Sequence, residues 1–133
     1  MKILIVDDSD IVRKRLMTVF SNLKEAENIR EARNTQEAIE IFDMMEPALA
    51  IVDIQLPGAT GIEVLRHIKH KDNKTTVIMY TSYPYSQYRE RCFDEGADYF
   101  FDKTTESEEL IDTIIRVIGS GDPKAERIYP GGG

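Results

Sequence analysis

The fold of this chain is constrained most strongly by a short apolar run, A-L-A-I-V at residues 48–52. Such a run, without polar alternation, is typical of a strand buried on both faces of a parallel sheet. Asp53 follows the run directly, and the sequence L-P-G at residues 56–58 then predicts a turn. The chain is therefore expected to present a carboxylate at the carboxyl end of a central strand, where open α/β sheets place their functional residues.

Four further segments are predicted to be strands, and segments with helical spacing of apolar residues alternate with them. These strands are expected at residues 2–6, 28–32, 76–80 and 99–101, with the second near an edge of the sheet. Five strands that alternate with five helices over short connections predict an α/β fold with a doubly wound parallel sheet. The flavodoxin-like strand order 2-1-3-4-5 is expected, which places the first and third strands side by side at the switch point.

Local signals mark the ends of several of these helices. Ser9 is predicted to cap the first helix. The runs N-T-Q-E at residues 34–37 and T-E-S-E at residues 105–108 are predicted capping boxes for the second and the fifth helix. Gly96 is the expected stop of the fourth helix.

Composition excludes several classes of protein. At 133 residues the chain is long enough for one domain, expected over residues 1–119, with a flexible tail or truncated linker at 120–133. The net charge of −7 argues against nucleic acid or a membrane surface as a direct partner. The single cysteine, Cys92, excludes an internal disulfide and fits a cytoplasmic protein, and we expect it to pack beneath a helix. His67 and His70 are expected on a solvated surface rather than in a metal site.

Acidic residues follow two strands that are expected to be neighbours. Asp7 and Asp8 come after the first strand and Asp53 after the third. At an effective dielectric constant of ~20, two carboxylates about 5 Å apart repel by roughly 3 kcal/mol, so such a cluster indicates a bound cation. Carboxylate oxygens suit Mg²⁺ or Mn²⁺. The alternative is that the acids at residues 7–10 only cap the first helix, which explains Asp10 but not Asp53.

Two further polar residues follow strands on the other side of Asp53. Thr81 comes after the fourth strand and Lys103 after the fifth. A hydroxyl, an ammonium group and a metal ion around one carboxylate provide ligands for the oxygens of a phosphoryl group. Each residue alone has an ordinary explanation, Thr81 as a strand end and Lys103 as a surface lysine paired with Asp102. The acids and these two residues together predict one site at the carboxyl edge of the sheet.

Three motifs give the chain a resemblance to a known family. They are V-D-D-S at residues 6–9, D-x-x-L-P-G-x-x-G at 53–61 and G-A-D-Y-F-F-D-K at 96–103. With them, residues 2–119 resemble the receiver domain of a two-component response regulator. The resemblance implies that Asp53 is the phosphoacceptor. It also implies a Mg²⁺ site whose ligands are Asp8, Asp53, the backbone carbonyl of Gln55 and, through a water molecule, Asp7.

The resemblance further implies a mechanism and a set of partners. Asp53 takes a phosphoryl group from the phosphohistidine of a sensor histidine kinase or a histidine phosphotransfer protein, and Thr81 and Lys103 each hold a phosphoryl oxygen. Phe100 is the expected switch residue together with Thr81, although plain packing explains Phe100 equally well. The switch changes the surface of the fourth helix, fifth strand and fifth helix, which contacts a downstream target, an output domain or a second copy. Such a domain is not a turnover enzyme and catalyses only its own phosphorylation and dephosphorylation.

The chain has residues near the expected site that depart from the family's pattern or flank the phosphoryl group. Thr104 stands where the family often has proline after the lysine, so a cis peptide bond is not expected there. Tyr83 follows Thr81 by two residues, and one hypothesis is that it restricts the water that hydrolyses the acyl phosphate. Tyr83 also begins an aromatic cluster with Tyr85 and Tyr88.

Three alternative functions remain at this stage. A phosphohydrolase with an aspartyl nucleophile commonly carries a second acid two residues later, where this chain has Gln55. A flavin- or nucleotide-binding module requires a phosphate loop after the first strand, but the sequence D-D-S-D at residues 7–10 is anionic. A receiver that is not phosphorylated and serves only protein contacts is disfavoured, because all the expected site residues are present.

Overall fold

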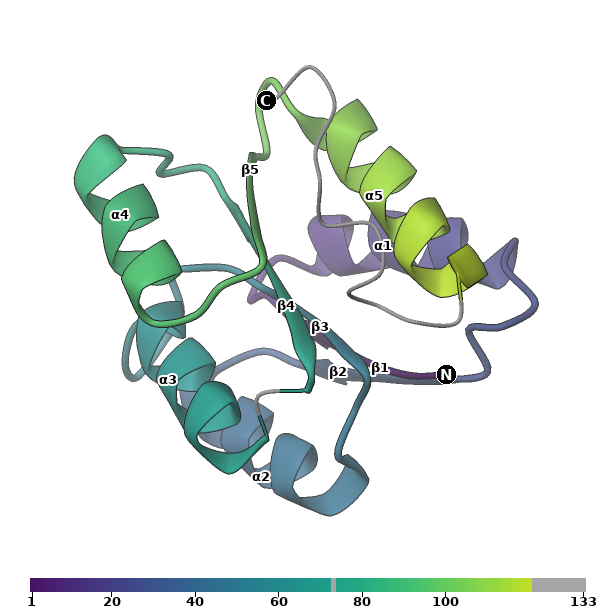
Figure 1. Cartoon of the computed structure of the whole chain (residues 1–133), viewed down its shortest axis with the longest axis horizontal. Coiled ribbons are helices and arrows are strands. Elements are labelled where there is room, and N and C mark those ends of the chain that lie inside the picture. The colour runs from purple at the N-terminus through teal and green to yellow at the C-terminus, as the bar shows by residue number, and fades with distance from the viewer. Residues whose placement is uncertain (73, 121–133) are drawn as a thin grey trace.

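The computed structural model of the chain describes residues 1–72 and 74–120, which form one parallel sheet with helices on both faces (Figure 1). The strand order is 2-1-3-4-5, as predicted. The strands are β1 (Lys2–Val6), β2 (Asn28–Ala32), β3 (Leu49–Val52), β4 (Thr76–Thr81) and β5 (Tyr99–Asp102). The helices are α1 (Asp10–Ser21), α2 (Thr35–Met45), α3 (Gly61–Lys71), α4 (Ser86–Asp94) and α5 (Ser107–Ser120). The predicted α/β fold with a doubly wound sheet is therefore confirmed.

Apolar side chains pack on both faces of the sheet, which explains why its central strands are continuous apolar runs. Leu4 and Val6 of β1 pack in the cluster that includes residues of α2, α3 and α4, whereas Ile3 and Ile5 pack in the cluster with α1 and α5. Figure 1 shows these two groups of helices on opposite sides of the sheet. Successive residues of a strand point to opposite faces, so a strand between two helical layers must be apolar at every position.

The parallel register brings the ends of β1, β3, β4 and β5 to the same edge of the sheet. Val6 is opposite Val52, and Val52 is opposite Met79. The backbone pairing continues beyond β3, because the Asp53 N–H donates to the Val6 carbonyl oxygen at 2.9 Å. The side chains that follow these strands therefore start from one row along the carboxyl edge.

Most of the predicted helix signals are confirmed. Ser9 caps α1, since its hydroxyl accepts a hydrogen bond from the Val12 N–H at 3.3 Å. Asn34 caps α2 by accepting from the Glu37 N–H at 2.8 Å. Gly96 has a φ of +101° just beyond the end of α4, a conformation that strongly favours glycine. Each of these signals acts within a few residues of a helix end.

The capping box predicted at residues 105–108 is wrong. α5 begins at Ser107, so Thr105 does not occupy the N-cap position. The Thr105 hydroxyl donates instead to Asp102 Oδ2 at 3.1 Å, and the Glu106 carboxylate accepts the Asp102 N–H at 3.0 Å. The polar side chains of this loop are organised around the end of β5 because Asp102 offers them both an acceptor and a donor.

Cys92 is fully buried in α4, as predicted, and burial raises the pKa of its thiol to about 11. No helix in the described part of the chain is both long and apolar enough to cross a membrane. α5 continues through Ser120, and the rest of the tail or linker predicted for residues 120–133 lies outside the described residues.

Candidate functional site

Three carboxylates meet at the carboxyl edge of the sheet. Asp7, Asp8 and Asp53 each offer one oxygen, and these oxygens all lie within 4.8 Å of one another. They come from the loops after β1 and β3, the adjacent strands at the switch point of the sheet. Asp7 and Asp53 are only 2% and 6% exposed, whereas Asp8 is exposed. Within residues 1–72 and 74–120 this is the single group of at least three acidic, histidine or cysteine side chains close enough to hold a metal ion.

Lys103 joins the two buried carboxylates. Its Nζ lies 2.6 Å from Asp7 Oδ2 and 2.9 Å from Asp53 Oδ2. Burial by itself lowers the pKa of Lys103, but the hydrogen bonds to Asp7 and Asp53 outweigh it and raise that pKa above the usual lysine value. Lys103 therefore carries its positive charge in this site at neutral pH.

The carboxyl group of Asp7 is destabilised in its charged form. Burial raises the pKa of Asp7 above its usual value, and the nearby charge of Asp53 acts in the same direction. The hydrogen bonds from Lys103 and from the Ser9 N–H, which lies 2.9 Å from Asp7 Oδ1, oppose this rise only in part. The Lys103 ammonium group thus compensates the burial of Asp7 only in part, and further positive charge near Asp7 would stabilise its carboxylate.

The carboxylate cluster opens into a surface pocket of about 520 Å³. Gln55 and Tyr83 line this pocket together with the acids and Lys103. The Gln55 N–H lies 3.4 Å from Asp53 Oδ1, which keeps the loop after β3 close to that carboxylate. Thr81 is fully buried at the end of β4, and its Oγ1 accepts the Tyr83 N–H at 3.1 Å. The Thr81 hydroxyl therefore holds the start of the loop after β4.

Phe100 lies in β5 and is only 3% exposed. Its ring centroid is 6.4 Å from that of Phe93 in α4. The guanidinium carbon of Arg89 lies 5.4 Å from the centroid of each of these two rings. The side chain therefore packs beneath α4, which agrees with the packing interpretation, and its role as a switch residue stays a prediction.

Arg13 of α1 is a neighbour of the site that sequence reasoning does not predict. Its buried guanidinium donates to the Asp7 carbonyl oxygen at 2.7 Å. It also forms ion pairs with Asp10 and, at 3.1 Å, with Glu31. The available signal is its spacing of three residues from Leu16, which places a cation on the buried face of the helix. Arg13 thereby holds the loop that carries Asp7 and Asp8.

Gly61, the last glycine of the motif at residues 53–61, lies against the backbone of Asp53. A Cβ atom at this position would come within 1.8 Å of the Asp53 carbonyl oxygen. The Gly61 N–H also donates to the Ile54 carbonyl oxygen at 2.7 Å. The motif contains the glycine, but only the structure shows that its role is this close approach.

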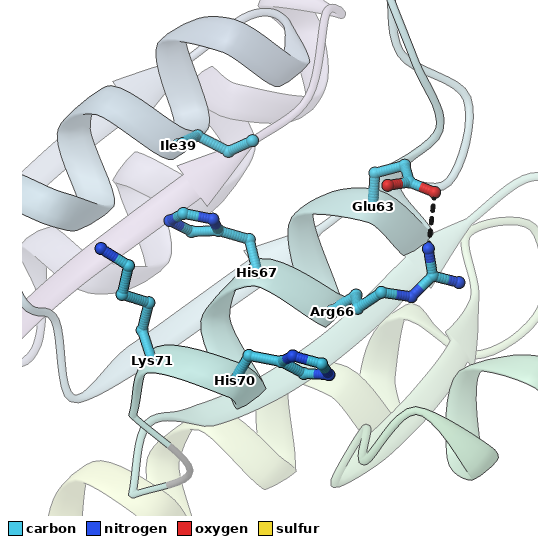
Figure 2. A pocket seen from close by; sticks show the side chains of 6 residues that line it. All are labelled: Ile39, Glu63, Arg66, His67, His70 and Lys71. Carbon is cyan, nitrogen blue, oxygen red and sulfur yellow. Dashed lines mark hydrogen bonds and ion pairs between the residues drawn. The ribbon is translucent and has the colours of Figure 1, made fainter.

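A second pocket of about 380 Å³ lies on the outer surface of α3, and Figure 2 shows six of its side chains. His67 points toward α2, where its Nε2 is 2.8 Å from Asp43 Oδ1, and His70 points away from it (Figure 2). The expected solvated surface agrees with these positions, since His70 is exposed and the His67 side chain is 23% exposed. The contact of His67 with Asp43 of α2 is an addition that sequence reasoning does not predict. The two imidazoles diverge and do not form a joint metal site.

The chain is similar to a known family and to several known proteins. The response regulator receiver domain family matches residues 3–115. Chemotaxis protein CheY of Halobacterium salinarum is 32% identical over 117 residues, which cover 88% of this chain and 96% of that protein. Sporulation initiation phosphotransferase F of Bacillus subtilis is 34% identical over 117 residues, which cover 88% of this chain and 93% of that protein.

Other relatives are longer than this chain. It spans 29% of the cyclic di-GMP phosphodiesterase of Thermotoga maritima, with 36% identity over 110 residues and 83% of this chain. It spans 54% of the transcriptional regulatory protein LnrK of Bacillus subtilis, with 31% identity over 120 residues and 90% of this chain.

A solved structure shows the same arrangement of strands and helices. The chain is similar to one in the CheX-CheY-BeF3-Mg complex from Borrelia burgdorferi, with a TM-score of 0.80, 26% identity and 88% of each chain covered. The family match, the relatives and the five-stranded order with its acidic edge agree with one another. This chain therefore belongs to the response regulator receiver domain family.

Proposed function

We propose that this chain is a phosphoacceptor switch of a two-component system and that Asp53 is the residue phosphorylated. The observation that carries the proposal is the contact between Lys103 Nζ and Asp53 Oδ2 at 2.9 Å, inside a cluster of three carboxylates. A buried acid beside a fixed ammonium ion suits a nucleophile whose product bears more negative charge than the free carboxylate.

The donor atoms of the site fit a divalent metal ion. Receiver domains bind Mg²⁺ at an acidic pocket, and this chain has an aspartate cluster there. The cluster offers only oxygen ligands, which suits Mg²⁺ and also Mn²⁺. We expect Asp8, Asp53 and the backbone carbonyl of Gln55 to hold the ion, with Asp7 acting through a water molecule. When bound, Mg²⁺ offsets the negative charges of the carboxylates and the phosphoryl oxygens.

The chain's own residues perform the transfer in our proposal. An Asp53 carboxylate oxygen forms a bond to phosphorus, and the P–N bond of the phosphohistidine breaks with its electron pair passing to the imidazole nitrogen. Lys103 holds one phosphoryl oxygen. Thr81 holds another, because a hydroxyl that accepts one hydrogen bond, here from the Tyr83 N–H, still has its own hydrogen to donate.

The downstream part of the proposal concerns the surface of α4, β5 and α5. We expect the movement of Thr81 and Phe100 to change this surface and so alter the binding of a downstream target, an output domain or a second copy of the chain. The phosphodonor would be a sensor histidine kinase or a histidine phosphotransfer protein in the cytoplasm. The similar chain from Borrelia burgdorferi belongs to a complex of CheX with CheY, which supports a protein partner for this fold. Apart from its own phosphorylation and dephosphorylation, we propose no enzymatic activity.

The first test is mass spectrometry of the intact chain after incubation with acetyl phosphate and Mg²⁺. We expect one added phosphoryl group in the wild type and none in Asp53→Ala, because Asp53 is the proposed nucleophile and lies beside both Lys103 and the other two carboxylates. Asp112→Asn, which changes an exposed acid of α5, serves as the matched control and should be labelled like the wild type. An unlabelled wild type that steadily hydrolyses a phosphoester would instead favour the phosphohydrolase.

The second prediction concerns Tyr83, an exposed side chain that lines the pocket beside Asp53. If its ring restricts the attacking water, Tyr83→Ala should shorten the lifetime of the phosphorylated chain roughly threefold to tenfold, as expected when a group that excludes water is lost. Tyr85→Ala is the control, because Tyr85 is also exposed but is absent from the lining of this pocket. Equal dephosphorylation rates for Tyr83→Ala and the wild type would remove this role.

A further inference from the structure

A chain of hydrogen bonds connects Tyr80 of β4 with the backbone of Lys103. The Tyr80 hydroxyl of β4 is 2.7 Å from Ser107 Oγ, in the first turn of α5. Ser107 Oγ in turn lies 3.0 Å from the Lys103 carbonyl oxygen. A carbonyl only accepts, so the Ser107 hydroxyl donates to Lys103, and the Tyr80 hydroxyl must then donate to Ser107. The three residues form one directed chain from β4 through α5 to the lysine backbone.

Tyr80 also contacts the charged end of the lysine. Lys103 Nζ lies 5.8 Å from the centroid of the Tyr80 ring, which is a cation–π distance. The tyrosine is buried, and its ring belongs to the apolar cluster between the sheet and the helices α1 and α5. The Tyr80 side chain thus contacts the Lys103 ammonium group directly, and it reaches the Lys103 backbone through Ser107.

The space between Lys103 and the helices α1 and α5 is only partly filled. A cavity of about 130 Å³ is lined by Val12 and Leu16 of α1 and by Leu110 of α5, and it borders Lys103, Tyr80 and Ser107. A lysine side chain loses up to about 2 kcal/mol of rotamer entropy when it is held in one conformation. With open space beside it, this side chain depends on specific contacts to keep its position.

The residue after Lys103 is Thr104 and not proline, so no proline ring restricts the backbone there. The Lys103 N–H donates to the Thr81 carbonyl oxygen at 2.9 Å, and the Lys103 carbonyl accepts from Ser107. Both polar groups of the Lys103 backbone are therefore held, one by β4 and the other by the Tyr80–Ser107 pair.

We propose that Tyr80 and Ser107 are positioning residues, which hold Lys103 where it can bind a phosphoryl oxygen on Asp53. The inference rests on the proposed function, since the position of Lys103 affects a rate only if Asp53 is phosphorylated. It concerns residues that touch neither the donor nor the metal ligands and that act through the lysine.

The test measures the rate at which acetyl phosphate with Mg²⁺ labels Asp53, followed by mass spectrometry. Tyr80→Phe keeps the ring and removes the hydroxyl, and Ser107→Ala removes the next hydroxyl in the chain. We expect each to slow labelling roughly fivefold, because small displacements of a positioning group are costly in rate. The double variant should be little slower than either single one, since both interrupt the same chain. Ser107→Thr keeps a hydroxyl and should restore most of the rate.

Two further variants separate positioning from general destabilisation. In a Lys103→Met background, Tyr80→Phe should cause no additional slowing, because the group on which Tyr80 acts is gone. Thr113→Val is the matched control, since the Thr113 hydroxyl is also on α5 and donates to a backbone carbonyl, that of Glu109, at 2.8 Å. We expect this control to lower stability without slowing labelling.

Each outcome has a separate meaning. Labelling of Tyr80→Phe and Ser107→Ala at the wild-type rate would overturn the inference and leave the proposed function intact. Full slowing by Tyr80→Phe in the Lys103→Met background would also overturn it, since the effect would then not pass through the lysine. A wild type that is never labelled at Asp53 would overturn the proposed function itself, and the inference with it.

Discussion

Gly61→Ala is expected to destabilise the protein by about 3 kcal/mol or more and to slow phosphorylation of Asp53 by roughly 100-fold. The added Cβ would lie 1.8 Å from the Asp53 carbonyl oxygen and 2.7 Å from its carbonyl carbon. Both are backbone atoms, so no side-chain rotation relieves the overlap. The start of α3 or the end of β3 must move, and a shift of the backbone at Asp53 would displace its carboxylate from Lys103.

Urea denaturation and the labelling rate with acetyl phosphate measure the two effects of Gly61→Ala. Gly119→Ala is the first control, because no atom lies within 4 Å of its Cβ and α5 should gain about 0.5–1 kcal/mol from the change. Gly58→Ala is a control in the same loop as Gly61. Its φ of +98° strains an alanine by about 1–2 kcal/mol, again without an overlapping atom. Stability of Gly61→Ala close to that of the wild type would contradict the steric argument.

Lys69→Met is expected to lower the free energy of unfolding by about 3–5 kcal/mol. Lys69 Nζ in α3 lies 2.8 Å from Asp98 Oδ2, and their side chains are only 9% and 2% exposed. The ammonium group also donates to the Thr75 carbonyl oxygen at 2.7 Å. Methionine keeps the apolar stem but removes the cation, so the Asp98 carboxylate stays buried with its charge compensated far less well. The Val77 N–H, at 2.9 Å from the same oxygen, offsets only part of that cost.

Urea denaturation of three variants tests this ion pair. Lys71→Met is the surface control, since its side chain is 59% exposed and lies 3.8 Å from Asp43, so less than about 1 kcal/mol is expected. The double variant Lys69→Met/Asp98→Asn should recover part of the loss, because it removes the buried charge as well as its partner. A loss for Lys69→Met no larger than that of Lys71→Met would show that the pair does not stabilise the fold.

The strands are the part of the fold that sequence reasoning predicts best. β1 and β2 have the predicted ends, and those of β3, β4 and β5 differ from the expected ends by one residue. β2, with the sequence N-I-R-E-A, lacks a continuous apolar run but lies at an edge of the sheet, where its exposed residues face solvent. Parallel strands that are covered by helices on both faces consist almost entirely of apolar residues. Such runs are easily recognised in the sequence, which is why these predictions succeed.

The failures occur where a side chain has several polar neighbours. The capping box predicted at residues 105–108 is locally plausible. In the structure, however, the Asp102 carboxylate accepts a hydrogen bond from the Thr105 hydroxyl, and the Asp102 N–H donates to the Glu106 carboxylate. The contact of His67 with Asp43, a residue 24 positions earlier in the chain, is likewise absent from the sequence prediction. Serine, threonine and acidic side chains can form hydrogen bonds of similar strength with several nearby groups. A sequence pattern does not show which of these hydrogen bonds forms in the folded protein.

The sequence by itself determined the kind and order of the elements, their parallel pairing, and which polar residues leave the ends of the central strands. These properties follow from periodicity and turn chemistry, which act over a few residues. Only the tertiary structure decided how the emerging side chains share partners. Lys103 bridges Asp7 and Asp53, Arg13 holds the Asp7 carbonyl, and Tyr80 reaches the lysine through Ser107. These contacts join residues up to 96 positions apart, and they depend on side-chain directions that exist only once the sheet has assembled.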